Sequence, residues 1–355
     1  MEDIYRKLAK HLDNLPGGYP ATESGVELRI LKRLFDPREA EIAMHLALFP
    51  ETASAIAARM NHDEQAMADI LESMAKKGLI NRLTKGGQRL FMALQFVVGI
   101  WEFQVNNLNE ELIRDFDEFI PYLLKQAAPL NTQQMRVIPV AESLSAETAI
   151  LPYDEAEKII RNQSKILVLP CICRRERQMA GHGCSAPLEV CMAFGTTAYF
   201  YEENGIGRAI SQEEALLVLK KGIKAGLVMQ STNSQKPMNI CMCCSCCCGI
   251  LRNANQFGKS LALFLGANYY AQVSEEECTG CSACEDRCPM KAIAVDDIAH
   301  VDLEKCIGCG QCAATCSLDA IRLKMKEEGH RITPPSNTTD TYIRIMEERG
   351  RKAGG

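Results

Sequence analysis

The chain has 355 residues, of which 47% are apolar and 24% are charged, a balance that is typical of globular proteins and excludes a disordered or fibrous chain. A usual domain size of about 100 to 200 residues predicts two to four folded units. The net charge of -5 disfavours a dedicated nucleic-acid-binding protein and favours a neutral or basic protein partner.

The N-terminus and the longest apolar run bear on location. The opening residues MEDIYRKLAK are acidic and lack the apolar core of a secretory signal. The apolar run that starts at Phe91 is interrupted by Gln95, Gly99 and Glu102, so it falls short of the roughly 18 residues of a membrane span. We therefore expect a cytoplasmic protein with no membrane span, whose 18 cysteines stay reduced.

The overall prediction is an α+β multidomain protein that begins with an N-terminal segment, 1–25, and a winged-helix-like domain, 26–98. REAEIAMHLALF and ETASAIAARM are its first two predicted helices, the second with Thr52 near its cap. A third helix is expected from Asn61, as its N-cap, to Gly78. Its buried face, at helical spacing, is formed by Met67, Ile70, Leu71 and Met74. Two short strands around Lys85-Gly86-Gly87 would form the wing.

A winged helix suggests DNA as a partner, because its third helix would enter the major groove. The charges disagree with that function, since residues 1–100 hold equal numbers of basic and acidic side chains. The third helix also starts with Asp63 and Glu64, whose carboxylates would repel phosphates. DNA binding is therefore open but disfavoured, and we favour docking or homodimer formation through this domain.

Residues 99–273 are expected to form a central, cysteine-rich domain of mixed α/β structure. RVIPV from Arg136 and KILVLP from Lys165 predict strands, whereas PYDEAEKIIRNQ and ISQEEALLVLKKGIKAGL predict helices, the latter capped by Ser211. The domain holds two groups of cysteines. The first group is Cys171, Cys173, Cys184 and Cys191, and the second is Cys241, Cys243, Cys244, Cys246, Cys247 and Cys248.

These ten cysteines fit no standard spacing and leave four interpretations open. An additional iron-sulfur centre is favoured, because such a density of thiolates selects soft metals. Zinc bound by the four cysteines of the first group is an alternative, as is a redox dithiol formed by Cys244 and Cys247. One or two of the ten cysteines could be inert buried thiols. If residues 243–248 were helical, Cys244, Cys247 and Cys248 would share one face. The predicted strands end just before Cys171 and Cys241, which could bring both groups to one edge of a sheet.

Residues 274–325 contain an internal repeat, CTGCSACEDRCPMKAIAV and CIGCGQCAATCSLDAIRL, and are expected to form a βαβ repeat. Each copy has the spacing C-x2-C-x2-C-x3-C that binds a [4Fe-4S] cluster, with the fourth cysteine ligating the other cluster. The first predicted cluster is therefore bound by Cys278, Cys281, Cys284 and Cys316. The second is bound by Cys306, Cys309, Cys312 and Cys288.

This segment resembles the bacterial two-cluster ferredoxins over about fifty residues. The resemblance implies one-electron transfer at low potential; Ser317, in place of a proline, changes no ligand. The further combination of PCICR and C-x-CC-x-CCC-G resembles a group of poorly characterised 4Fe-4S proteins from anaerobes. That resemblance implies a larger redox enzyme as partner and supplies no catalytic residue.

We expect an electron-transfer component with two [4Fe-4S] clusters and an additional metal centre, rather than a stand-alone enzyme. The sequence has neither the G-x-G-x-x-G pattern of dinucleotide-binding folds nor a P-loop. Two alternatives stay open: a redox-sensing transcription regulator, and a reductase that acts at the central cysteines. The C-terminal tail, 326–355, is expected to end in a solvated helix, DTYIRIMEERGRKA.

Overall fold

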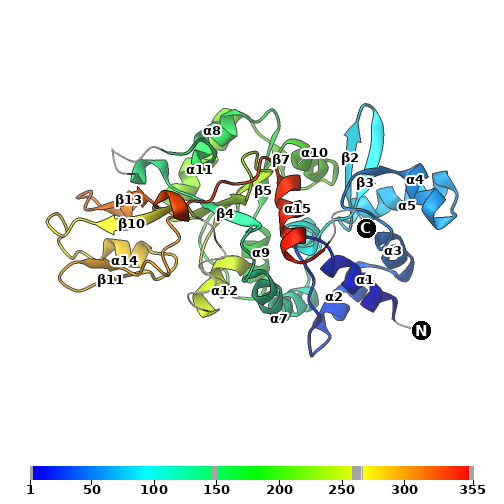
Figure 1. Ribbon diagram of the computed structural model, residues 1–355, viewed down its shortest axis with the longest axis horizontal. Coiled ribbons are helices and arrows are strands. Elements are labelled where there is room, and N and C mark those ends of the chain that lie inside the picture. The colour runs from blue at the N-terminus through cyan, green and yellow to red at the C-terminus, as the bar shows by residue number, and fades with distance from the viewer. Residues whose placement is uncertain (1–2, 145–149, 258–264, 266, 352–355) are drawn as a thin grey trace.

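The computed structural model describes residues 3–144, 150–257, 265 and 267–351 (Figure 1). The ends of the predicted N-terminal segment and tail, 1–2 and 352–355, lie outside the described residues. Within the described part of the chain, the longest helices are too short or too polar to cross a membrane.

The N-terminal third is helical and carries one small sheet. Its helices are α1 (Ile4–Asp13), α2 (Val26–Leu34), α3 (Pro37–Ala43), α4 (Ala53–Met60) and α5 (Glu64–Lys76). Its strands are β1 (Glu51–Thr52), β2 (Asn81–Lys85) and β3 (Gln88–Met92), in the order β1-β3-β2. Gly86 and Gly87 both have positive φ, which a two-residue hairpin turn between β2 and β3 requires.

The predicted helix caps are confirmed in part. The Thr52 side chain accepts a hydrogen bond from the Ala55 N–H and caps α4, and Gly78 follows the end of α5 with a φ of 73°. The predicted cap at Asn61 is wrong, because Asn61 ends α4 in a left-handed conformation. Asp63 caps α5 instead, accepting from the Ala66 N–H, since its side chain is closer to the first free amides of that helix.

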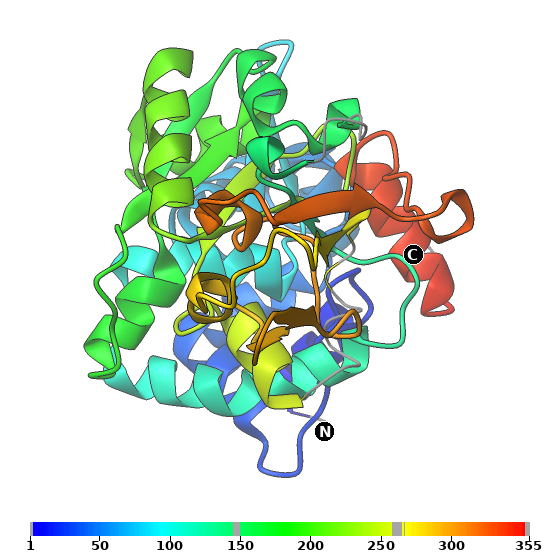
Figure 2. The ribbon, with the colours of Figure 1, turned by 90° about the vertical axis from the view of Figure 1, so that its left-hand side faces the viewer.

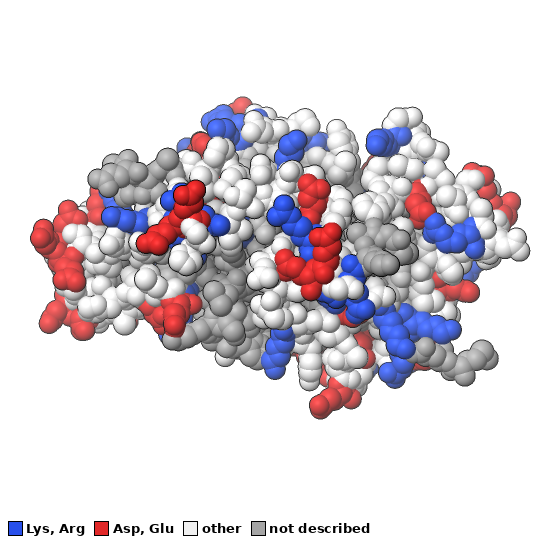
Figure 3. Space-filling view, in the orientation of Figure 1, with Lys and Arg blue, Asp and Glu red and all other residues white. Residues whose placement is uncertain are grey.

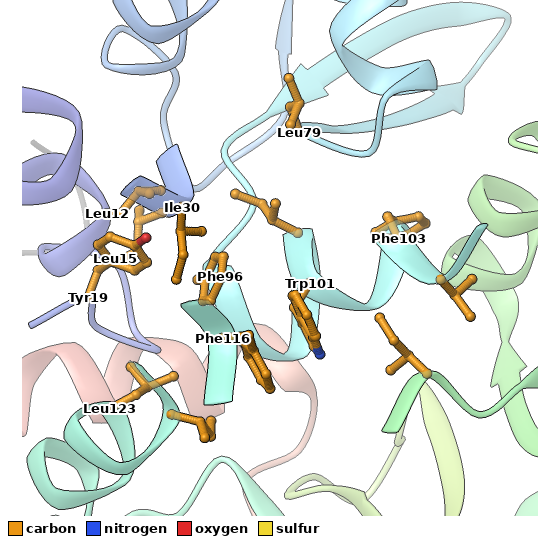
Figure 4. Packing of buried hydrophobic residues seen from close by; sticks show 14 of the residues in the cluster. Leu12, Leu15, Tyr19, Ile30, Leu79, Phe96, Trp101, Phe103, Phe116 and Leu123 are labelled. Carbon is orange, nitrogen blue, oxygen red and sulfur yellow. The ribbon is translucent and has the colours of Figure 1, made fainter. Parts of the chain in front are cut away.

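A linking segment joins the N-terminal third to the central domain. It consists of the irregular stretch Phe96–Ile100, the short helices Trp101–Phe103 (α6) and Gln104–Asn106, and the long helix α7 (Glu110–Ala127). Trp101 stacks on Phe116 with ring centroids 3.6 Å apart, and Phe96 packs between them and Tyr19 (Figure 4). The largest hydrophobic core is continuous from these aromatic residues to the central sheet.

The central domain is built on a six-stranded antiparallel sheet in the order β4-β8-β9-β6-β5-β7. The strands are β4 (Met135–Ile138), β5 (Ile166–Pro170), β6 (Glu189–Phe194), β7 (Arg208–Ala209), β8 (Val228–Thr232) and β9 (Asn239–Cys243). The helices are α8 (Ala156–Arg161), α9 (Ile172–Met179), α10 (Gly195–Glu203), α11 (Gln212–Lys224) and α12 (Gly249–Phe257). The strands predicted at Arg136 and Lys165 and the cap at Ser211 are confirmed.

The cysteine repeat lies at one end of the molecule and packs on the central domain (Figures 1 and 2). Its first half contains β10 (Tyr269–Val273), α14 (Ala283–Arg287) and β11 (Ile293–Val295). Its second half contains β12 (Ala299–Val301), a short helix (Ala313–Thr315) and β13 (Ile321–Met325). The pairing is antiparallel, β10 with β13 and β11 with β12, so the strands of each half pair across the repeat rather than within it. Strand β10 precedes the predicted boundary at residue 274.

The C-terminal helix α15 (Thr338–Glu348) crosses back over the molecule, and the expectation of a solvated helix is wrong. Ile345 and Met346 are buried, and the Thr341 hydroxyl donates to the carbonyl of Asn233 in the central domain at 2.6 Å. Arg349 forms a 3.0 Å ion pair with Asp13 of α1. The tail looks polar in sequence because its apolar side is narrow, but that side is covered by two other parts of the chain.

Candidate metal centres

Six of the ten central cysteines meet on one side of the central sheet. Cys171 and Cys173 lie at the start of α9, directly after β5; Cys191 lies on β6. Cys241 and Cys243 lie on β9, and Cys248 precedes α12. Because β5, β6 and β9 are neighbours in the sheet, cysteines that are up to 77 positions apart in the sequence come together.

The six thiols interact as a closed ring, which we call the six-thiol ring. In order of contact it runs through Cys171, Cys173, Cys248, Cys243, Cys241, Cys191 and back to Cys171. All six line one cavity of about 130 Å³. The ring therefore brings six sulfur atoms to one cavity, where several of them could ligate one metal cluster.

Protein groups around the ring favour negatively charged sulfur. The Asn239 Nδ2 lies 3.2 Å from the Cys241 Sγ, and the Gln230 Nε2 lies 3.8 Å from the Cys248 Sγ. Arg174 is 3% exposed and donates to the carbonyls of Met242 and Pro187. These donors match what ligating thiolates need from their surroundings, namely hydrogen bonds and compensating charge.

The pKa values alternate around the ring. Contacts with the neighbouring thiols hold the pKa values of Cys171, Cys241 and Cys248 well below the usual thiol value. The same contacts, together with burial, raise the pKa values of Cys173, Cys191 and Cys243 well above it. Ionisation of one ring thiol therefore opposes ionisation of the two beside it. A cation or cluster at the centre would relieve the repulsion that prevents all six from ionising.

Two further ionisable side chains border the same cavity. Burial raises the pKa of Glu102 to about 8, although its Oε2 accepts a hydrogen bond from the Gly99 N–H at 2.5 Å. Burial, and after it the charge of Glu102, raises the pKa of Tyr201 well above its usual value. No local sequence signal points to these two residues or to Gln230, because each reaches the cavity from an element that carries no cysteine pattern.

The remaining four central cysteines form a second group, which we call the four-thiol cluster; one of them, Cys244, also borders the cavity of the ring. Cys184 comes from the loop between α9 and β6, and Cys244, Cys246 and Cys247 come from the turn between β9 and α12. All four Sγ atoms lie within 4.8 Å of one another. The Sγ–Sγ distances from Cys184 are 3.6 Å to Cys247 and 3.9 Å to Cys244, and that between Cys246 and Cys247 is 3.8 Å.

This division bears on three interpretations of the central cysteines that the sequence left open. A zinc site made of the first group alone is wrong, because Cys184 leaves that group while its other members join the ring. Residues 243–248 do not form one helix: Cys243 ends β9 and a turn follows, and Cys247 and Cys248 fall into different groups. The redox dithiol of Cys244 and Cys247 is disfavoured, since burial raises the pKa of both thiols, that of Cys244 to about 12, and so reduces the share of reactive thiolate.

The eight cysteines of the repeat gather around two small cavities. Cys278, Cys281, Cys284 and Cys316, the outer set, line a cavity of about 20 Å³. Cys288, Cys306, Cys309 and Cys312, the inner set, line another of about the same volume. The structure thus brings together the two groups that the spacing predicts, each with its fourth cysteine from the other copy.

Backbone groups close to these sulfurs suit cluster binding. The Ala299 N–H points to the Cys278 Sγ at 3.4 Å, and the Ala292 N–H points to the Cys288 Sγ at 3.2 Å. Gly308 has a φ of 60°, and a Cβ there would lie 2.1 Å from the Tyr269 carbonyl oxygen. The loop of the inner set therefore requires glycine at this position to pack against β10.

The inner set is the one that faces the central domain. Its Cys309 belongs to the same hydrophobic core as Cys243 and Cys248 of the ring. The Val140 N–H donates to the Cys309 carbonyl at 3.1 Å, and the Ser143 hydroxyl donates to the Gly310 carbonyl at 2.7 Å. The outer set lies farther out, and its Cys281 is exposed.

Comparison with known proteins identifies one segment of the chain. Residues 271–317 match the family described as the 4Fe-4S dicluster domain. No curated protein and no solved structure matches the chain. Residues 271–317 therefore support 4Fe-4S cluster binding, and together with the central cysteines they point to iron-sulfur electron transfer.

Proposed function

We propose that this protein is an iron-sulfur electron-transfer protein that relays electrons between a partner redox enzyme and a centre in its own central domain. The outer and inner sets would each hold one [4Fe-4S] cluster, and the six-thiol ring would hold a further iron-sulfur centre. When bound, these groups supply one-electron redox chemistry. The observation that carries the proposal is that cysteines of the inner set and of the ring belong to one continuous hydrophobic core, through which electrons would pass.

A specific connection supports this route. Gln311, between Gly310 and Cys312, donates from its Nε2 to the Leu227 carbonyl at 2.8 Å. The next residue, Val228, is the β-sheet partner of Cys243 in the ring. One side-chain hydrogen bond, one peptide unit and one strand pairing therefore connect the loop of the inner set to a ring cysteine.

The partner enzyme would dock at the outer set. The exposed acidic side chains there, which we call the acidic patch, are Glu275, Glu276, Glu277, Glu285, Asp286, Asp296, Asp297 and Asp319. Acidic residues gather at this end of the molecule in Figure 3. Leu318, 50% exposed, adds an apolar contact beside Cys316. A partner with a basic surface would bring its own redox centre close to the outer cluster.

The N-terminal helices and hairpin would form a winged helix that docks on the central domain rather than on DNA. Arg82 on β2 and Arg89 on β3 both pair with Glu72 and with Glu203 of α10. Their charges are thus neutralised within the chain. Asp63 and Glu64, at the start of α5, are exposed and would repel phosphates.

Iron and sulfide analysis of anaerobically purified protein tests the proposal. We expect more than the roughly eight irons that two [4Fe-4S] clusters account for, about twelve if the ring holds four. Cys241→Ser/Cys243→Ser should lower the count to about eight and leave the EPR spectrum of the reduced dicluster domain unchanged. Cys281→Ser, as a matched control, should remove iron from the outer set alone. About eight irons in the unaltered protein would contradict a centre at the ring.

A further inference from the structure

We propose that the four-thiol cluster, Cys184, Cys244, Cys246 and Cys247, is a second and separate metal site that holds a single Zn²⁺ ion. The ten central cysteines would then serve two centres, a buried one at the six-thiol ring and a mononuclear one beside it. This inference goes beyond the proposed electron transfer and does not depend on what the ring binds.

The distances between the sulfur atoms fit one tetrahedral ion. Four sulfurs at the Zn–S distance of about 2.3 Å form a tetrahedron with edges of about 3.8 Å. The observed Sγ–Sγ distances of 3.6, 3.8 and 3.9 Å match this edge, and no pair in the group exceeds 4.8 Å. Cysteines in a [4Fe-4S] cluster bind four different irons at the corners of a cube, which holds their sulfurs farther apart than ligands of one ion.

A disulfide or a set of inert thiols fits this gathering of sulfur atoms less well than a metal site does. A disulfide needs an S–S distance of about 2.0 Å, and all four cysteines are free. Inert thiols would pack with apolar side chains, yet Cys184 and Cys246 are exposed and still lie in the cluster. Four sulfur ligands from the protein leave no open position, which is the composition of structural zinc sites.

Zinc suits the constraints of the chain better than iron does. Cys246 and Cys247 are adjacent residues, so the directions of their sulfurs are restricted by the backbone between them. Zn²⁺ has no geometric preference from its d electrons and tolerates such restriction. It also undergoes no redox chemistry, so it would not divert electrons from the neighbouring ring.

The position of the site indicates what the ion would do. It would join the loop at Cys184 to the turn at 244–247, whose two flanking residues, Cys243 and Cys248, belong to the ring. The Cys248 N–H donates to the Cys244 carbonyl at 3.0 Å, so the two sites share this turn. The zinc would therefore fix the turn from which two ring cysteines point into the cavity.

Metal analysis of the anaerobically purified full chain, with variants, tests the inference. We expect one zinc per chain, lost in Cys184→Ser/Cys246→Ser and retained in the neighbouring control Ser185→Ala. The EPR spectrum of the dicluster domain should be the same in all three proteins. X-ray absorption at the zinc edge of the unaltered protein should show four sulfur ligands at about 2.3 Å. This measurement does not depend on the folding of any variant.

Three outcomes would overturn the inference. Nitrogen or oxygen ligands at the zinc would place it elsewhere in the chain. Iron in place of zinc at a mononuclear tetrathiolate site would refute the choice of metal. Loss of iron without loss of zinc in Cys184→Ser/Cys246→Ser would assign these thiols to the cluster of the ring. A low total iron count with one tetrathiolate zinc would instead uphold this site while contradicting the ring centre.

Discussion

Glu176 shows how a single buried residue makes stability depend on pH. It lies on α9, three residues after Cys173 of the six-thiol ring, is 1% exposed, and has the Arg252 Nη2 at 4.0 Å from its Oε1. That arginine is engaged by Asp117 at 2.6 Å. Burial, and after it the charge of Asp117, raises the pKa of Glu176 to about 8. The folded protein therefore keeps a proton on Glu176 that the unfolded chain, with a usual pKa near 4.3, releases.

Because the folded state binds the extra proton, stability falls as pH rises from about 4.5 to 8 and levels off above that range. The side chain introduced by Glu176→Gln cannot ionise, so we expect the variant to lose less stability as the pH rises. The free energy of unfolding of the variant should match that of the unaltered protein near pH 5 and exceed it at pH 8 by about 2 to 4 kcal/mol. Anaerobic thermal unfolding at a series of pH values measures the difference. If the two proteins differed in stability by the same amount at every pH, the pH dependence could not be assigned to Glu176.

At the scale of elements, ion pairs connect the β2–β3 hairpin and α5 to α10, which packs on the central sheet. Arg82 on β2 is 3% exposed and lies 3.1 Å from Glu72 on α5 and 3.0 Å from Glu203 on α10. The Asn204 Nδ2 donates to the Ala75 carbonyl at 2.9 Å beside them. One arginine thus connects the hairpin, its neighbouring helix and the next domain.

Replacing Arg82 by Met keeps much of the side-chain length but removes the buried one of the two arginines that pair with Glu72 and Glu203, so only the half-exposed Arg89 is left between these carboxylates. We expect the free energy of unfolding of this variant to be lower by about 2 to 4 kcal/mol. Hydrogen exchange of the β2–β3 amides, followed by mass spectrometry, should speed up by at least about tenfold. Lys85→Met, at the exposed end of the same hairpin, serves as control and should leave the exchange unchanged. Equal exchange in both variants would mean that the contact does not hold the domains together.

At the scale of the whole molecule, the uneven distribution of charge matters more than the net charge of -5. The acidic patch surrounds the outer set, so it would attract cations to the exposed cluster and slow the approach of anions. Such steering acts on association rates and weakens as salt increases.

The patch predicts opposite effects on two small oxidants of the reduced protein. Oxidation by the cation hexaammineruthenium(III) should slow with added salt, whereas oxidation by the anion ferricyanide should accelerate. Converting Glu275, Glu276 and Glu277 to Lys should slow the cation by about tenfold and speed up the anion. The control converts the exposed Glu23, Glu41 and Glu64, in the N-terminal third, to Lys. Equal effects of the two triple variants, measured by stopped-flow spectroscopy, would exclude local steering.

The sequence by itself determined the grouping of the eight C-terminal cysteines, because short, regular spacing fixes which thiols can reach one centre. It also predicted the strand that leads into Cys171 and the caps at Thr52 and Ser211, since these depend on neighbouring residues. The buried side of α15 was missed, because a narrow apolar stripe acquires meaning only from the surfaces that cover it.

Only the tertiary structure decided how the ten central cysteines divide. Cys184 lies near Cys191 in the chain but joins Cys244, Cys246 and Cys247 in space, whereas Cys243 and Cys248, at the two ends of the same turn, contact the thiols of the ring. Spacing cannot resolve this, because adjacent cysteines on a strand end and a turn point in different directions. The order β8-β9-β6-β5 sets which distant thiols meet, and that order follows from packing across the whole domain.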